Sequence, residues 1–395
     1  MLSKVSIDEL FVNCLIFVIM FYPPLGMFNL INPLLLFYFV VRYYKFNKSK
    51  RRSVLPLFFF LLIVLSFTLN ASANPTAINF VSVSQAIMIS LILVFFPLIP
   101  NFKLYDLTVF VCTLYLLFSQ ICYSLNISYF ISFFDTFYPY EGSIISYSSD
   151  YLQSQTELLE SNLRLGGLFH NPNHCSRIYT FLLAIFTIEH PRYDRKKILL
   201  LGVMLFGIVL TGSRTGLIIA LCIIILDYYL KTKDNFLVFI LTAIGILTIF
   251  VFDAIDFGAY RAFSFSAGSE TSLSSKFTRF FSYMEGETNA LFILFGHFDL
   301  RTTAEYLTGN EQLDSEWAYM IFSYGIFSIF VLLLFYFNRF REMTAQYRII
   351  ALPLLWCVTS TILLAHRISL LYFILFSIYY QRSMINRVSY KHGRK

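Results

Sequence analysis

Charged residues are scarce in this chain, and it has no polar, low-complexity linker of the kind that separates soluble domains. Only 13% of its 395 residues are charged, whereas 57% are hydrophobic. So little charge and so many long apolar runs exclude an ordinary soluble fold. The short alternating segments that are typical of a membrane β-barrel are also lacking. The composition predicts an all-α polytopic integral membrane protein, with residues 1–395 forming a single membrane domain.

Motifs for metal or nucleotide binding are missing as well. There is no Asp-x-Asp pair, no His-Glu-x-x-His and no phosphate-cradling P-loop. The six cysteines show no Cys-x-x-Cys spacing and stand mostly inside apolar runs, so we interpret them as small core residues. We therefore expect no metal and no cofactor. Nor does the net charge of +7 indicate nucleic-acid binding, because membrane topology explains where the basic residues stand.

The apolar runs predict about 12 transmembrane helices, joined mostly by short turns. We place these helices at residues 8–22, 27–42, 55–70, 77–98, 104–123, 174–190, 197–212, 215–230, 235–253, 316–337, 349–364 and 367–381. Two connecting segments are much longer than the others, residues 124–173 and 254–315. In the second of these, apolar and basic residues alternate at helical spacing around Phe280, which predicts an amphipathic helix.

The basic residues predict the orientation of the helices. They cluster after the even-numbered helices, at residues 42–52, 192–197, 231–233, 339–348 and 382–395. Cytoplasmic loops of membrane proteins are enriched in Lys and Arg, so we expect these clusters and both termini in the cytoplasm of a bacterial inner membrane. The segments 124–173 and 254–315 are then the two large periplasmic loops.

A first polar segment interrupts the apolar sequence between Arg164 and Arg177. Its Asn171-Pro172-Asn173 sequence indicates a turn, and an apolar helix follows at once, with Asn173 or His174 as its expected cap. Cationic and imidazole side chains thus stand at the mouth of a membrane helix. A cation inside the membrane is costly unless it is paired or solvated, so we interpret this mouth as part of an outward-facing anion site.

Two further polar segments stand at helix ends. Thr211-Gly212-Ser213-Arg214 predicts a tight turn that places Arg214 at the start of the next helix, where backbone N–H groups and the helix dipole favour an anion. The alternative is a plain turn whose arginine contacts lipid headgroups. In the third segment Asp314 or Ser315 is a natural helix cap, whereas the functional interpretation makes Asp314 or Glu316 a general base.

Together these segments resemble the O-antigen polymerase and O-antigen ligase superfamily (Wzy and WaaL). The resemblance covers Arg164 to Ser328 and rests on three features: Arg164 and Gly167 ahead of Asn-Pro-Asn, the Thr-Gly-Ser-Arg turn, and Arg279 followed by Leu294-Phe295-Gly296. The ligase branch has a histidine, then Asn, Ser or Gln, nine residues and a glycine. Here the spacing from Ser315 to Gly325 is kept, but Asp314 replaces the histidine. This departure favours the polymerase branch.

The resemblance implies a GT-C-like membrane glycosyltransferase that polymerises polysaccharide repeat units. Its donor and acceptor would be undecaprenyl-diphosphate-linked oligosaccharides, and a chain-length regulator and a flippase would be its partners. Arg164, Arg177, Arg214 and Arg279 would bind the diphosphate, and Asp314, with Glu316 and His170 in reserve, would deprotonate the acceptor hydroxyl. An O-antigen ligase, a flippase for lipid-linked oligosaccharides and a structural scaffold for other polysaccharide enzymes remain the alternatives.

Overall fold

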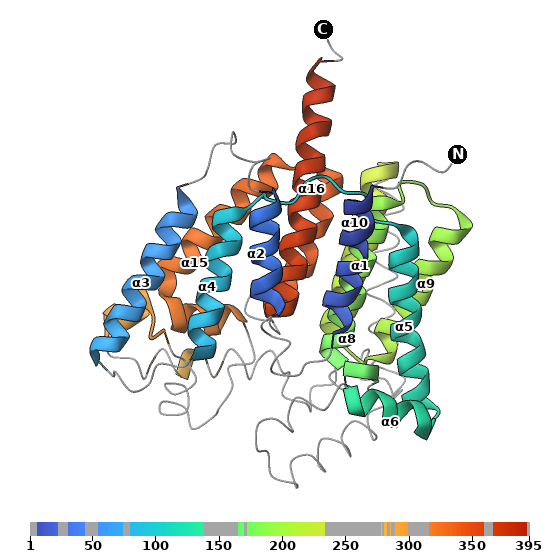
Figure 1. Ribbon diagram of the computed structural model, residues 1–395, viewed down its shortest axis with the longest axis horizontal. Coiled ribbons are helices and arrows are strands. Elements are labelled where there is room, and N and C mark those ends of the chain that lie inside the picture. Colours follow the sequence, from blue (N-terminus) through green and yellow to red (C-terminus); the bar gives the residue numbers. More distant parts are fainter. Residues whose placement is uncertain are drawn as a thin grey trace. The chain divides into compact units, whose positions relative to one another are not determined.

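The computed structural model describes residues 6–22, 31–43, 54–73, 80–137, 165–169, 172–233, 278, 280–282, 285, 289–298, 316–358 and 366–392. Every regular element in these ranges is helical, as the composition predicts (Figure 1). The chain divides into two compact units, each assembled from segments that are distant in the sequence. Unit 1 comprises residues 1–30, 102–267 and 345–353, and unit 2 comprises residues 31–101, 268–344 and 354–395.

Unit 1 is built around helix α8. Its helices are α1 (Ile7–Phe21), α5 (Asp106–Ser124), α6 (Ser128–Phe137), the 3-10 turn η4 (Gly167–Phe169), α8 (Pro172–Glu189), α9 (Arg195–Leu210) and α10 (Arg214–Thr232). Helix α8 packs against α5, α9 and α10, and it is buried without interruption from Cys175 to Ile188. A helix that is apolar and buried on all sides is a core helix of the unit that contains it.

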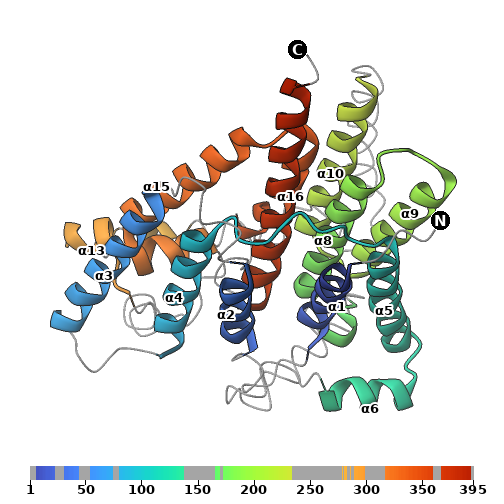
Figure 2. The ribbon, with the colours of Figure 1, turned by 45° about the horizontal axis from the view of Figure 1, so that its top comes forward.

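Contacts at the helix ends give the directions within unit 1. The start of α5 lies against the end of α8, where Asp106 Oδ1 is 2.8 Å from His190 Nε2. The start of α1 is tied to the start of α5 through Asn13, which donates to Lys103 O (2.9 Å) and accepts from the backbone N–H of Tyr105 (2.8 Å). Helices α8 and α10 therefore run in one direction, and α1, α5 and α9 in the other. Helix α6 runs across the far end of α5 (Figure 2).

Unit 2 is organised along α15. Its helices are α2 (Ile31–Tyr43), α3 (Leu55–Ala73), α4 (Phe80–Phe95), α13 (Ala290–Phe295), α15 (Glu316–Glu342) and α16 (His366–His392). The 3-10 helix η5 (Ala345–Val358) passes from unit 1 into unit 2. Helix α15 packs against α3 and α13, and α16 packs against α2 and α4.

Helix α15 is broken at Gly325, whose φ of 77° and ψ of 163° are non-helical. The break frees two carbonyls of the preceding turn, and a neighbouring segment uses them: His297 N donates to Phe322 O (2.6 Å) and Phe298 N to Ser323 O (2.8 Å). A Cβ atom on Gly325 would lie 2.1 Å from the carbonyl oxygen of Leu294, so only glycine fits this close approach. The break thus joins α13 to α15 through their backbones.

Among the described residues, five helices are long and apolar enough to cross a bilayer. They are Leu55–Ser72, Asp106–Ser124, Arg214–Thr232, Trp317–Glu342 and Arg367–Arg387. Ile31–Tyr43 and Val83–Phe95 are shorter apolar helices. This is the organisation of a helical membrane protein. The expected total of about 12 spans and the GT-C-like arrangement stay predictions.

Most of the predicted helices are confirmed within a few residues. They are those at 8–22, 27–42, 55–70, 77–98, 104–123, 174–190, 197–212, 215–230 and 316–337, together with the start of the one at 367–381. The prediction for 349–364 differs, because the structure has the 3-10 helix η5 there and Pro353 within it lacks a backbone N–H. Helix α16 continues to His392, beyond its predicted end. The predicted helix 235–253 lies outside the described residues.

Candidate substrate-binding site

The first polar segment forms the beginning of α8. The helix starts at Pro172, a residue that suits the first helical position because it has no N–H to leave unpaired there. Asn173 and His174 consequently lie in the first turn and do not cap the helix as expected. Arg177 follows one turn later and is only 3% exposed. A buried cation therefore lies near the N-terminal end of α8. The first backbone N–H groups of a helix have no partner within the helix, so they can bind an anion there.

The second polar segment forms the turn between α9 and α10. Gly212 has a φ of 59°, a conformation that glycine adopts without strain. Thr211 Oγ1 accepts from the backbone N–H of Ser213 (3.2 Å), and Ser213 Oγ caps α10 by accepting from Gly216 N (3.4 Å). Arg214 is the first residue of α10, so the predicted turn and the predicted position of this arginine are confirmed.

These two polar segments, about 40 residues apart in the sequence, are joined directly. Ser213 Oγ donates to Asn173 Oδ1 (3.2 Å), which links the first turn of α8 to the cap of α10. In the backbone, Leu165 N donates to Leu210 O (2.9 Å). Since α8 and α10 are parallel, two helix N-terminal ends meet here, and each carries an arginine. Parallel N-terminal ends combined with arginines are a favourable environment for a phosphate or diphosphate.

A buried glutamine on α5 connects the segments that form the N-terminal ends of α8 and α10. Gln120 is fully buried, and its Nε2 donates to Leu165 O (3.0 Å) and to Gly207 O (3.1 Å). Its Oε1 accepts from the hydroxyl of Tyr179 on α8 (2.9 Å). One side chain thus links α5, α8, α9 and the segment that leads into α8. We did not single out Gln120 or Tyr179 from the sequence, although an amide inside an apolar run was the available signal.

The segment before α8 fits tightly on α5. Gly167 has a φ of 58°, and a Cβ atom there would lie 2.4 Å from Ser119 Oγ. The same Ser119 hydroxyl accepts from the backbone N–H of Leu168 (3.2 Å). Phe169 then stacks on His174 with ring centroids 5.4 Å apart. These contacts fix the backbone that leads from residue 165 into the candidate site.

The structure does not describe the side chains of the other predicted catalytic and diphosphate-binding residues. Arg164, His170, Arg279 and Asp314 lie outside the described residues. Glu316 is the first residue of α15 in unit 2, but its side chain is outside the described set too. Of the six free cysteines, Cys112, Cys122 and Cys175 are buried in unit 1. In the described part of the chain, no three His, Cys, Asp or Glu side chains gather as metal ligands would.

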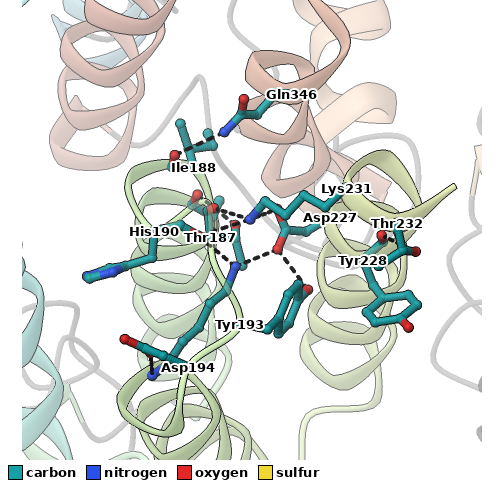
Figure 3. A network of polar contacts seen from close by, with 12 residues as sticks. Thr187, Ile188, His190, Tyr193, Asp194, Asp227, Tyr228, Lys231, Thr232 and Gln346 are labelled. Carbon is teal, nitrogen blue, oxygen red and sulfur yellow. Dashed lines mark hydrogen bonds and ion pairs between the residues drawn. The ribbon is translucent and has the colours of Figure 1, made fainter.

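The opposite end of α8 has a different polar network, which is shown in Figure 3. Asp227 of α10 is fully buried between Lys197 Nζ (2.7 Å) and Lys231 Nζ (2.6 Å), and Tyr193 donates its hydroxyl to Asp227 Oδ2 (2.8 Å). Both lysines also donate to the carbonyl of His190, at 2.8 and 2.9 Å. Burial, followed by the charge and hydrogen bond of Asp227, raises the pKa of Tyr193 well above its usual range.

This network uses one residue of the basic cluster at 192–197. Lys197 belongs to that cluster, yet its side chain has no exposed surface. The physical reason is Asp227, an acid inside an otherwise apolar helix, which neutralises the lysine and allows it to be buried. Lysines at a helix C-terminal end also complement the dipole of α8. The network therefore joins the ends of α8, α9 and α10.

Comparisons of this chain with protein-family models, with curated proteins and with solved structures found no match.

Proposed function

We propose that this protein is an inner-membrane glycosyltransferase that polymerises oligosaccharide repeat units carried on a lipid diphosphate. One observation carries the proposal: the parallel N-terminal ends of α8 and α10, bearing Arg177 and Arg214, are hydrogen-bonded to each other through Asn173 and Ser213. Such a site suits a diphosphate leaving group, because cations and backbone N–H groups stabilise the charge that develops on it. The site would face the periplasm, with both termini in the cytoplasm.

The proposed reaction transfers the growing glycan to a new repeat unit. The acceptor's sugar hydroxyl attacks the anomeric carbon of the donor, and the bond from that carbon to the diphosphate oxygen breaks. The hydroxyl proton passes to a base, for which Asp314 is the first candidate and Glu316 and His170 the alternatives. The lipid diphosphate departs with the bond's electron pair and is held by Arg177 and Arg214, with Arg164 and Arg279 as further candidates.

The reaction is tested with purified protein and synthetic lipid-diphosphate-linked repeat units, in the absence of nucleotide and added metal. We expect a ladder of polymer lengths from the wild type. Arg214→Ala should lower the rate about ten- to a hundredfold, since one charge-assisted hydrogen bond contributes roughly 1.5–3 kcal/mol. Arg214→Lys should lie between the two, because lysine keeps the charge but loses the two-pronged geometry of arginine.

The control is Arg195→Ala, an exposed arginine at the opposite end of unit 1. It should polymerise as the wild type does. If the wild type forms no ladder, or if Arg214→Ala leaves the ladder unchanged, the proposal fails. The compartment where repeat units accumulate in cells that lack the protein distinguishes the alternatives: they collect in the periplasm when a polymerase is lost and in the cytoplasm when a flippase is lost.

A further inference from the structure

Helix α6 takes no part in the candidate site, yet it carries a row of exposed aromatic rings. Tyr129, Phe133 and Phe137 recur every fourth residue and are 77%, 49% and 45% exposed. Residues at this spacing lie on one side of a helix. A short surface helix gains nothing from presenting three aromatic rings to water, so this row of rings suggests an apolar partner.

The other two sides of α6 have different surroundings. On one side Phe134 is 1% exposed, with its ring centroid 6.2 Å from those of Tyr115 and Tyr123. On the other side lie three small exposed hydroxyl residues, Ser128, Ser132 and Thr136. At about 100° per residue, the aromatic row lies between the protein-facing side and the hydroxyl side. This is the order of surfaces expected of a helix that lies flat at the boundary between a protein, a lipid phase and water.

The position of α6 identifies the lipid phase. It begins four residues after the end of α5, a 19-residue helix that is apolar enough to cross a bilayer. Between them Asn126 has a φ of 50°, and Ile127 N donates to Cys122 O (3.0 Å), so the chain turns sharply. Helix α6 consequently runs across the end of α5 (Figure 2). If α5 crosses a bilayer, this end lies where the bilayer ends. Leu125, 67% exposed, continues the apolar surface of α5 toward it.

The charge of α6 specifies how the lipid is bound. Its sequence contains one acid, Asp135, and no lysine or arginine. Attraction to anionic headgroups therefore contributes nothing, and the apolar area of the rings must supply the binding. Tyrosine and phenylalanine rings suit the boundary between headgroups and acyl chains.

We infer that α6 is an interfacial helix whose rings Tyr129, Phe133 and Phe137 insert into the boundary between lipid headgroups and acyl chains. The bilayer is thus the partner of this surface. Through this contact α6 fixes the depth of the end of α5, where Ser119 and Gln120 hold the segment that leads into α8.

Two neighbouring exposed positions provide the test. Phe133→Trp and Ser132→Trp are each prepared in the full-length protein, reconstituted in vesicles of neutral lipid, and measured as a difference from the wild type with its native Trp317 and Trp356. The quenchers are a lipid that carries a nitroxide near the glycerol level and aqueous iodide. The Phe133→Trp signal should lose about half of its emission to the lipid nitroxide and little to iodide, and Ser132→Trp should show the reverse.

Each other result overturns the inference. Quenching of both variants by iodide alone would place the rings in water, and quenching of both by the lipid would submerge the whole helix. Absence of quenching by either reagent would mean that protein covers the rings. The same measurement in vesicles with anionic lipid should give the same values, and a marked increase in lipid quenching there would contradict binding by apolar area alone.

Discussion

The two ends of the parallel helices α8 and α10 are held together by different chemistry. At the N-terminal ends, the hydrogen bonds described above link neutral groups, among them the side chains of Gln120, Tyr179, Asn173 and Ser213 and the backbone of residues 165 and 210. At the C-terminal ends, the buried carboxylate of Asp227 is shared by two lysines and a tyrosine. Buried ion pairs thus join the C-terminal ends, whereas the N-terminal ends place two arginines, Arg177 and Arg214, beside a set of neutral hydrogen bonds.

Unit 2 also has an ion pair at a helix C-terminal end, that of α15, although this one is partly exposed. Arg339 Nη1 is 3.0 Å from Glu342 Oε2, and Tyr380 of α16 donates its hydroxyl to the same carboxylate. Arg387 donates to Arg341 O and Met343 O, both at 3.2 Å, and so caps the last turn. Basic residues that the positive-inside pattern assigns to loops are thus used in both units to close helix C-terminal ends.

The largest effect on stability should come from Asp227→Asn. The substitution leaves Lys197 buried and without its full counter-charge, and breaking a buried ion pair in this way costs about 3–5 kcal/mol. We expect a large decrease in the thermal unfolding midpoint of the detergent-solubilised protein. The double variant Lys197→Met/Asp227→Leu should recover much of that loss, because it removes both charges and lets Lys231 reach solvent. Equal unfolding midpoints for Asp227→Asn and the wild type would show that the network adds nothing to stability.

A smaller effect is expected at the neutral end from Gly207→Ala. A Cβ atom at this position would lie 2.4 Å from the ring of Tyr179, which is fully buried and is held by the hydrogen bond of its hydroxyl to Gln120. Overpacking of this kind costs about 1–3 kcal/mol and here also displaces the hydroxyl that binds Gln120. The free energy of unfolding should decrease accordingly.

The matched control is Gly202→Ala on the same helix, where no atom lies within 4 Å of the added Cβ. Alanine favours a helix over glycine by about 0.5–1 kcal/mol, so this variant should be as stable as the wild type or more stable. If both glycine variants behave alike, the contact between Gly207 and Tyr179 is not tight, and the neutral end is looser than the ionic end.

The helices could be predicted from the sequence because apolar runs determine them locally. The turn at Gly212 and the start of α10 at Arg214 were also predictable, since glycine and serine have local preferences at turns and caps. Helix α6 was not predicted from the sequence. It has only ten residues and hardly any charge, so its helical spacing of apolar residues does not stand out in a chain so rich in aromatic residues.

Partnerships between distant residues could not be predicted. The burial of Lys197 depends on Asp227, and the role of Gln120 depends on Leu165, Tyr179 and Gly207, all of which are brought together only by packing. A single polar residue in an apolar run reveals that a partner exists, since an unpaired polar group is costly there. It does not reveal which residue that partner is. The sequence thus indicated which segments are polar, and the fold decided which of them meet.

The smallest effect should come from Tyr193→Phe, and its pH dependence distinguishes the ionic end from the neutral one. At pH 7 the loss of a hydrogen bond to a carboxylate should cost about 1.5 kcal/mol.

The pKa of Tyr193 is raised by burial and by Asp227, so the phenol stays protonated in the folded state after it ionises in the unfolded state. The contribution is therefore complete below about pH 10, the ordinary value for tyrosine, and decreases as the pH rises above it. The difference in unfolding free energy between wild type and Tyr193→Phe should be constant from pH 7 to about 9.5 and should shrink at higher pH. A difference that grows between pH 8 and 10 would mean that the Tyr193 hydroxyl ionises more readily in the folded state than in the unfolded state and does not donate to Asp227.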